Sequence, residues 1–315
     1  MSLLKQKILN RESGIITYGI TPPKKNNTEE KIKEISQKHI ERISGLDIDG
    51  LVIYDLQDEK ERVSEERPFP FIETIDPQIY SENYLKDLKI PKIIYRCVGK
   101  YTPDEFRRLT RPVSGQDAFS VFVGAASRNQ SVLLKLSDAY KIRQDVNPDL
   151  LLGGVAIPER HMKNTDEHLR IIDKINKGCK YFITQAVYNV EAAKDFLSDY
   201  YYYSKNNNLK MVPIIFTLTP CGSTKTLEFM KWLGISIPRW LENDLMNCED
   251  ILNKSVSLSK SIFNELMEFC LEKGIPIGCN IESVSVRKVE IEASIALAKD
   301  IKYIMKGEGH HHHHH

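Results

Sequence analysis

The sequence predicts a single-domain α/β protein, a (β/α)8 TIM barrel, and three observations support this prediction. Eight short and nearly continuous apolar runs recur along the chain, as expected of parallel strands that are covered on both faces. Each run is followed by a longer segment whose apolar residues have helical spacing. The first run lacks the glycine-rich dinucleotide motif of an open, doubly wound sheet.

The predicted strands are rich in β-branched residues and are separated by segments long enough for a helix. They lie at residues 14–20, 50–56, 91–98, 119–125, 150–157, 181–187, 211–218 and 275–281. The length of 315 residues is usual for one barrel with insertions.

Several predicted helices begin or end at characteristic residues. Thr28 precedes a charged helical segment, and Thr102 is followed by a proline, which is favoured at the first helical position. Val190 begins a long helical pattern, and Gly178 ends the helix before it. Residues 234–273 carry two helical patterns, which predicts an added helix before the eighth strand.

No linker or repeat divides the chain, so residues 1–309 are expected to form one domain and residues 310–315 a purification tag. Lysine plus arginine (44) nearly balance aspartate plus glutamate (43), which argues against nucleic acid or membrane partners. No apolar run reaches the roughly 18 residues of a membrane span, and no secretory signal is recognised. The six cysteines form no CxxC pair. We therefore expect buried thiols in a reducing compartment, the cytoplasm.

The native histidines, His39, His161 and His168, are too scattered in the sequence to predict a metal site, and none is expected. In a (β/α)8 barrel the site lies at the carboxyl ends of the strands. The residues at these positions are Tyr18, Gly19, Asp55, Gln57, Arg96, Gly124, Ala125, Ser127, Glu159, Arg160, His161, Gln185, Thr217, Thr219, Asn280 and Glu282.

Two of these groups have alternative interpretations. The Glu159-Arg160-His161 cluster fits a ligand contact or a surface loop with a local ion pair. Gln185 ends an apolar strand, so its amide needs hydrogen-bond partners. A heterocycle with donor and acceptor groups on one edge would supply them, and so would neighbouring backbone.

Motifs along the chain resemble those of the methylenetetrahydrofolate reductase family. They are ITYGITPP (16–23), GGVAIPERH (153–161), GCKYFITQAVYN (178–189) and TKTLEFMKWLGISIPRW (224–240), and the similarity covers roughly residues 14 to 300. The family is a flavin-dependent barrel of one-carbon and methionine metabolism. It transfers hydride from a reduced nicotinamide through FAD to 5,10-methylenetetrahydrofolate, and the product is 5-methyltetrahydrofolate.

The resemblance implies folate contacts for Gln185, on the pterin, for Phe229, by stacking, and for Arg287. Without the resemblance, the helical spacing of Phe229 with its neighbours would predict a core residue. Arg96, Arg128 and Arg160 are further candidates for the anionic tail of a folate. The candidate folate-binding residues are Tyr18, Asp55, Gln185, Phe229, Asn280, Glu282 and Arg287, and the weaker candidates for FAD are His161 and Lys174.

The sequence departs from the family where the chemistry takes place. Gly19 stands at the position of the proton-donating glutamate, and such an acid contributes roughly 10²–10⁴-fold to rate. Residues 122–125 lack the family's arginine and aspartate, and residues 94–96 lack its histidine. Ile157 and Ile172 replace two further groups of the FAD site. We therefore expect weakened or lost FAD binding, retained folate binding, and a larger cavity beside Gly19.

Other functions remain open from sequence. A working reductase would need a replacement acid, for which Asp55, Glu159 and Glu282 are candidates. An unrelated catalytic barrel and a scaffold protein are further alternatives, because a fold does not fix a function. The predicted partner is a reduced folate, and the sequence leaves open a homo-oligomer or a companion subunit.

Overall fold

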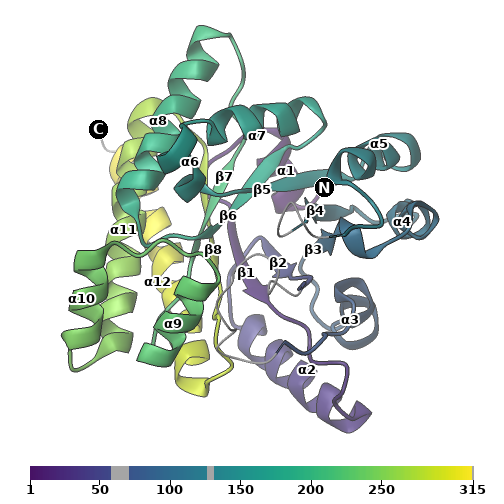
Figure 1. The fold of residues 1–315 in the computed structure, drawn as a ribbon, viewed down its shortest axis with the longest axis horizontal. Helices are drawn as coiled ribbons and strands as arrows, with labels where there is room; N and C mark the ends of the chain where they lie inside the picture. The colour runs from purple at the N-terminus through teal and green to yellow at the C-terminus, as the bar shows by residue number, and fades with distance from the viewer. Residues whose placement is uncertain (58–70, 126–130, 314–315) are drawn as a thin grey trace.

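The computed structural model describes residues 1–57, 71–125 and 131–313, and its strands form a closed parallel barrel in sequence order. Figure 1 shows the strands at the centre and the helices around them. Thr17 lies opposite Asn280 where the first and last strands pair. The predicted (β/α)8 fold is confirmed. The strands are β1 (Ile16–Ile20), β2 (Gly50–Ile53), β3 (Lys92–Cys97), β4 (Phe119–Val123), β5 (Leu151–Ala156), β6 (Tyr181–Ala186), β7 (Ile214–Leu218) and β8 (Ile277–Ile281).

The helices surround the barrel, and the first of them covers the end at which the strands begin. They are α1 (Leu3–Leu9), α2 (Glu29–Ser44), α3 (Pro77–Tyr84), α4 (Pro103–Thr110), α5 (Leu136–Val146), α6 (Pro158–Asn164), α7 (Glu167–Asn176), α8 (Val190–Asn206), α9 (Thr224–Trp232), α10 (Arg239–Asn247), α11 (Ile251–Lys273) and α12 (Lys288–His313), with a 3₁₀ turn at Val98–Lys100. Two predicted starts are confirmed, since the hydroxyls of Thr28 and Thr102 accept hydrogen bonds from backbone N–H groups of α2 and α4. Residues 234–273 form α10 and α11.

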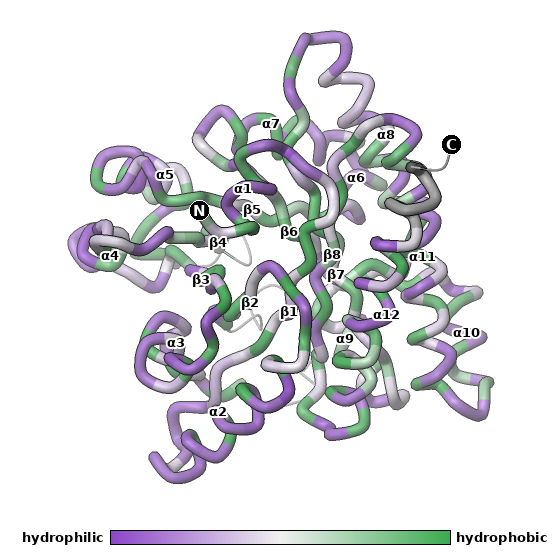
Figure 2. Tube along the Cα trace, turned by 180° about the vertical axis from the view of Figure 1, so that it is seen from behind, coloured by the Kyte–Doolittle hydropathy of each residue, from purple (hydrophilic) through white to green (hydrophobic). Residues whose placement is uncertain are grey.

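Alternation along each strand separates two apolar layers. The side chains on one face of each strand pack against the helices. Those on the other face fill the barrel interior, where Leu4 and Ile8 of α1 close the end at which the strands begin. Tyr181 lies inside, and a Cβ on Gly153 would come within 2.3 Å of its ring, so this position needs a glycine. Figure 2 shows hydrophobic strands and more polar outer helices. Side chains therefore fill the barrel interior up to its mouth, which is the end formed by the carboxyl ends of the strands.

Two expectations about the environment of the chain bear on this core. Five of the six cysteines are buried free thiols and Cys248 is partly buried, so the prediction of core cysteines is confirmed for the buried five. Across the described ranges, none of the helices combines the length and the hydropathy needed to cross a bilayer.

Candidate functional site

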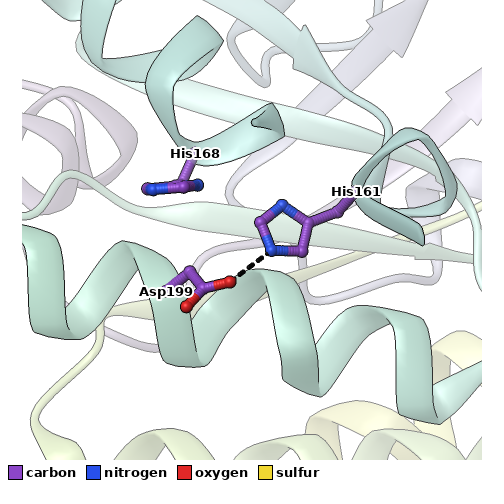
Figure 3. A group of neighbouring side chains, drawn as sticks. All are labelled: His161, His168 and Asp199. Carbon is purple, nitrogen blue, oxygen red and sulfur yellow. Dashed lines mark hydrogen bonds and ion pairs between the residues drawn. The ribbon is translucent and has the colours of Figure 1, made fainter. Parts of the chain in front are cut away.

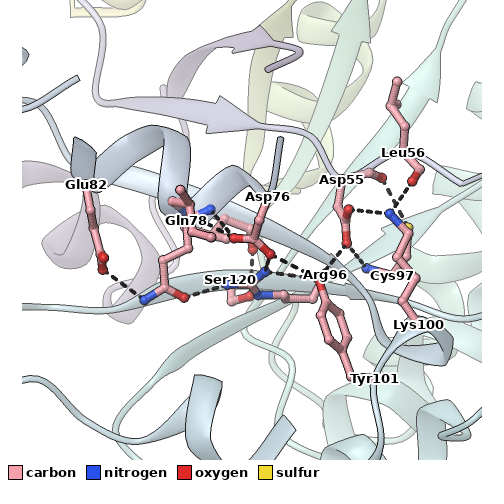
Figure 4. Close-up of polar contacts among 12 residues, drawn as sticks. Asp55, Leu56, Asp76, Gln78, Glu82, Arg96, Cys97, Lys100, Tyr101 and Ser120 are labelled. Carbon is pink, nitrogen blue, oxygen red and sulfur yellow. Dashed lines mark hydrogen bonds and ion pairs between the residues drawn. The ribbon is translucent and has the colours of Figure 1, made fainter. Parts of the chain in front are cut away.

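Polar side chains gather in two parts of the barrel mouth. The first part, called here the β2–β3 sector, consists of Asp55, Asp76, Arg96, Lys100 and Tyr101 (Figure 4). Arg96 is 4% exposed, and its guanidinium donates to Asp76 Oδ2 at 2.6 Å and to the Tyr101 hydroxyl at 3.1 Å. Burial alone would raise the pKa of Asp76, but the charge and hydrogen bonds of Arg96 hold it below its usual value.

Asp55 completes this sector after β2. Its carboxylate accepts from Lys100 Nζ at 2.6 Å and from the backbone N–H of Cys97 at 2.7 Å. Lys100 also donates to the carbonyl of Leu56. The charges of the β2–β3 sector are thus paired with one another in a fixed geometry.

The second part, called here the β6–β8 sector, consists of Gln185, Phe229, Glu282 and Arg287. Gln185 Nε2 donates to the carbonyl of Leu233, directly after α9, at 2.8 Å. Phe229 lies on α9 and stacks against Trp232, with ring centroids 6.2 Å apart. The structure therefore brings the end of β6 close to the end of the helix that carries Phe229.

Asn280 occupies the interior of the barrel rather than its rim. Its amide donates to the Tyr54 hydroxyl at 2.8 Å and to Thr217 Oγ1 at 3.1 Å, and it accepts from Thr17 Oγ1 at 2.7 Å. The side chain is fully buried. These bonds tie β8 to β1, β2 and β7 below the mouth.

Tyr54 fills the space beside the glycine of the first strand. A Cβ on Gly19 would lie 2.7 Å from Tyr54 Cε2, so the expectation of an enlarged cavity there is wrong. The Tyr54 ring packs edge-on against Tyr95, with centroids 4.9 Å apart. The small residue on β1 is matched by a large one directly after the neighbouring strand, β2.

Glu282 follows β8 and is hydrogen-bonded to Tyr54. Burial raises the pKa of its carboxyl to about 7. A carboxyl whose pKa is raised toward neutrality retains its proton more readily at neutral pH than an ordinary glutamate, so it can donate a proton or a hydrogen bond. Of the candidate acids, Glu282 is connected to the position of Gly19 through Tyr54, which contacts both residues.

Arg287 and Tyr18 lie toward α12. Arg287 is half-exposed and its guanidinium contacts Glu290 Oε1 at 2.9 Å, while Thr226 on α9 donates to the same oxygen. The Tyr18 hydroxyl lies 2.7 Å from Ser294 Oγ on α12. Tyr18 thus faces the helix layer, because successive residues of a strand point to opposite faces and Thr17 points inward.

The residues after β5 form a helix, α6, rather than the alternative surface loop. Both carboxylate oxygens of Glu159 are buried without a hydrogen-bond partner among the described residues, and burial raises its pKa to about 7. His161 contacts Asp199 on α8, and Lys174 Nζ donates to the carbonyl of Val155. These three residues do not join either sector.

Two candidates that the sequence predicted at the mouth, Ser127 and Arg128, lie outside the described residues. A cavity of about 260 Å³ lies elsewhere, between α7, α8 and the segment after α1, and its walls include Arg11 and Tyr200. Because the site of such barrels lies at the opposite, carboxyl end of the strands, this cavity does not mark it.

Sequence reasoning missed Tyr54, Asp76 and Lys100. Tyr54 directly precedes Asp55 in the second apolar run and reads as a strand residue. Asp76 and Lys100 lie 20 and 4 residues from Arg96, with nothing in the sequence to pair them. The sequence could have pointed to them only through their position, because each lies within a few residues of a strand end or of a helix start.

The sequence profile of the methylenetetrahydrofolate reductase family matches residues 129–277. Among solved structures, the chain is similar to an uncharacterized protein from Clostridium thermocellum that binds two copies of 5-methyl-5,6,7,8-tetrahydrofolic acid. The two are 94% identical with a TM-score of 0.88, over 96% of this chain and 100% of that chain. A comparison with curated proteins finds no match.

Two further solved structures are more distant. A 2,3-dimethylmalate lyase is 14% identical with a TM-score of 0.41, over 97% of this chain and 98% of that one. A dihydropteroate synthase from Xanthomonas albilineans is 11% identical with a TM-score of 0.43, over 96% and 97%. Neither similarity bears on function.

Proposed function

The chain belongs to the methylenetetrahydrofolate reductase family, and we propose that it is a reduced-folate-binding protein whose flavin chemistry is weakened or lost. The observation that carries the proposal is the 94% identical protein that binds two copies of 5-methyltetrahydrofolic acid. At this identity few side chains differ, so the same ligand and the same stoichiometry are expected here.

The β6–β8 sector supports a pterin site at the mouth. Among the described residues, the Gln185 amide has one backbone carbonyl as its hydrogen-bond partner, and Phe229 on α9 offers an aromatic ring. A pterin carries donors and acceptors on one edge of a flat ring, which matches an amide beside an aromatic side chain. Arg287 is half-exposed and contacts Glu290 through Nη1, so its other N–H groups can meet the glutamate tail of a folate.

The two residues that the resemblance offers for FAD are engaged with other groups. His161 is turned toward Asp199 on α8. Lys174 donates to the carbonyl of Val155, and burial lowers the pKa of its amine. A diphosphate would have to break these contacts before it gained a cation. This supports loss of the family's cofactor.

Calorimetric titration with 5-methyltetrahydrofolate tests the binding proposal. Two ligands per chain are expected, as in the related protein. Gln185→Leu should weaken affinity by about 1–3 kcal/mol, because the pterin edge would lose its partner. Gln116→Leu, at an exposed loop position, is the control and should bind normally.

The unfolding midpoint of each variant separates lost binding from lost folding. An unchanged affinity in folded Gln185→Leu would remove this residue from the site. If titration of the parent chain with 5-methyltetrahydrofolate released or absorbed no heat of binding, the proposal would be overturned. Added FAD should leave the visible spectrum that of free flavin.

A second function, reduction of methylenetetrahydrofolate, is favoured by one observation. Glu282 combines a pKa of about 7 with a hydrogen bond to Tyr54, which fills the space next to Gly19. It could therefore hold a proton where the family has its acid. A yellow purified protein and turnover that is lost in Glu282→Gln would establish this function. A colourless protein that binds folate without turnover would exclude it.

A further inference from the structure

The geometry points to a divalent metal site, best suited to Zn²⁺, between α6, α7 and α8 on the outer wall of the barrel. Its ligands are His161, His168 and Asp199, which come from one helix each (Figure 3). The site lies outside both sectors of the mouth. It is therefore independent of the proposed folate binding.

The three side chains already converge. His161 Nε2 lies 2.5 Å from Asp199 Oδ2, and one ligand atom from each residue lies within 4.8 Å of the other two. Nitrogen and oxygen ligands of tetrahedral Zn²⁺ lie about 3.3 Å from one another, given bonds of roughly 2.0–2.2 Å. Binding therefore requires the His161–Asp199 contact to open slightly and His168 to move closer. Small side-chain rotations achieve both.

Buried ring nitrogens without partners are the second observation. His161 is 1% exposed, and its Nδ1 has no hydrogen-bond partner among the described residues. His168 Nδ1 is also buried and also has no hydrogen-bond partner among the described residues. Buried polar atoms are normally satisfied, so the unsatisfied Nδ1 of His168, beside the His161–Asp199 pair, indicates an absent partner that the ion would supply. His161 would bind the ion through Nε2, the nitrogen that already faces Asp199.

The chemistry of the ligands selects the ion. Two imidazoles and a carboxylate suit Zn²⁺, whereas Mg²⁺ and Ca²⁺ prefer oxygen ligands alone. The Asp199 side chain is 48% exposed, so an ion can enter from solvent and keep a water as its fourth ligand. Asp166, at the start of α7, adds negative charge near His168. The site would fasten α6, α7 and α8 together.

A simpler interpretation is an ion pair between His161 and Asp199 that joins α6 to α8. This pair accounts for the 2.5 Å contact. It does not account for His168, whose ring lies edge-on to His161 with centroids 5.3 Å apart and whose buried nitrogen lacks a partner. The metal explains all three residues together.

The test uses the full chain without residues 310–315, because the histidines of the tag would themselves bind the ion. Titration with ZnCl₂ should show a single site, and Co²⁺ should give the visible absorption of a tetrahedral ion. Zn²⁺ should raise the thermal midpoint, since it binds the folded chain. A dissociation constant weaker than about 1 mM would overturn the proposal.

Two variants of the proposed ligands and one control variant test whether Zn²⁺ binds at these residues. His168→Ala and Asp199→Asn each remove a ligand and should weaken Zn²⁺ binding by more than about tenfold. Asp195→Asn changes an exposed carboxylate one turn earlier on α8 and should leave binding unchanged. Equal affinity in all three variants would show that Zn²⁺ binds elsewhere and would also overturn the proposal.

Discussion

The two sectors of the barrel mouth differ in how their polar groups are satisfied. In the β2–β3 sector, two acids and two bases pair among themselves, and Arg96 is almost completely buried between its partners. In the β6–β8 sector, Gln185 donates to one backbone carbonyl and the carboxyl of Glu282 is held near its neutral form.

This difference indicates which part of the mouth can still bind a ligand. A buried ion pair resists disruption, because removing one partner leaves an unpaired charge in a poorly solvated place. An amide bonded to backbone at the edge of the barrel can exchange that partner for a ligand at small cost. We therefore expect folate recognition in the β6–β8 sector and a structural role for the β2–β3 sector.

The largest expected effect tests the structural role of the β2–β3 sector. Arg96→Met should lower the free energy of unfolding by about 3 kcal/mol, because Asp76 loses the cation that compensates its burial. Urea unfolding measures the change. Arg107→Met breaks an exposed pair with Asp145 and should change stability by less than about 1 kcal/mol.

Folate affinity then distinguishes the two sectors. Folded Arg96→Met should bind 5-methyltetrahydrofolate as the parent does. A large loss of affinity without a loss of stability would place Arg96 in the ligand site and remove the contrast between the sectors.

A smaller effect is expected at the boundary between the sectors. Gly19→Ala should destabilise the chain by about 1–3 kcal/mol, because the new methyl group would lie 2.7 Å from Tyr54 Cε2. In a Tyr54→Ala background the same substitution should cost less. A double-mutant cycle by urea unfolding measures this coupling, and additive effects would contradict the packing of Tyr54 against Gly19.

The smallest effect concerns the carboxyl of the β6–β8 sector. The pKa of Glu282 is raised from 4.5 to about 7, so the folded state binds more protons than the unfolded state between these values. Stability should therefore fall as pH rises through this window. A shift of this size corresponds to about 3 kcal/mol for a fully buried group, and we expect about 1–2 kcal/mol because the Glu282 side chain is only partly buried.

Glu282→Gln should remove that part of the pH dependence, as measured by urea unfolding at pH values of about 4.5 and about 8. Glu228→Gln, at an exposed position on α9, should retain it. The same slope in both variants would show that Glu282 is not the group whose ionisation is suppressed.

The sequence predicted the barrel because eight buried strands each leave a nearly continuous apolar run, and a helical segment follows each run. It placed most strand ends within about three residues. The short helices α1, α3 and α6, of 7 or 8 residues, were not predicted, since two turns are too short for a clear helical period. The strand-end rule also placed Gln185 and Glu282 correctly at the mouth.

What the sequence by itself determined was therefore the fold and which residues lie at the carboxyl ends of the strands. Only the tertiary structure decided that Tyr54 fills the space beside Gly19, that Arg96 pairs with Asp76, and that His161 and His168 meet Asp199. The reason is physical. Apolar periodicity is a local property of the chain, whereas hydrogen bonds and ion pairs depend on distances that exist only once distant segments have packed together.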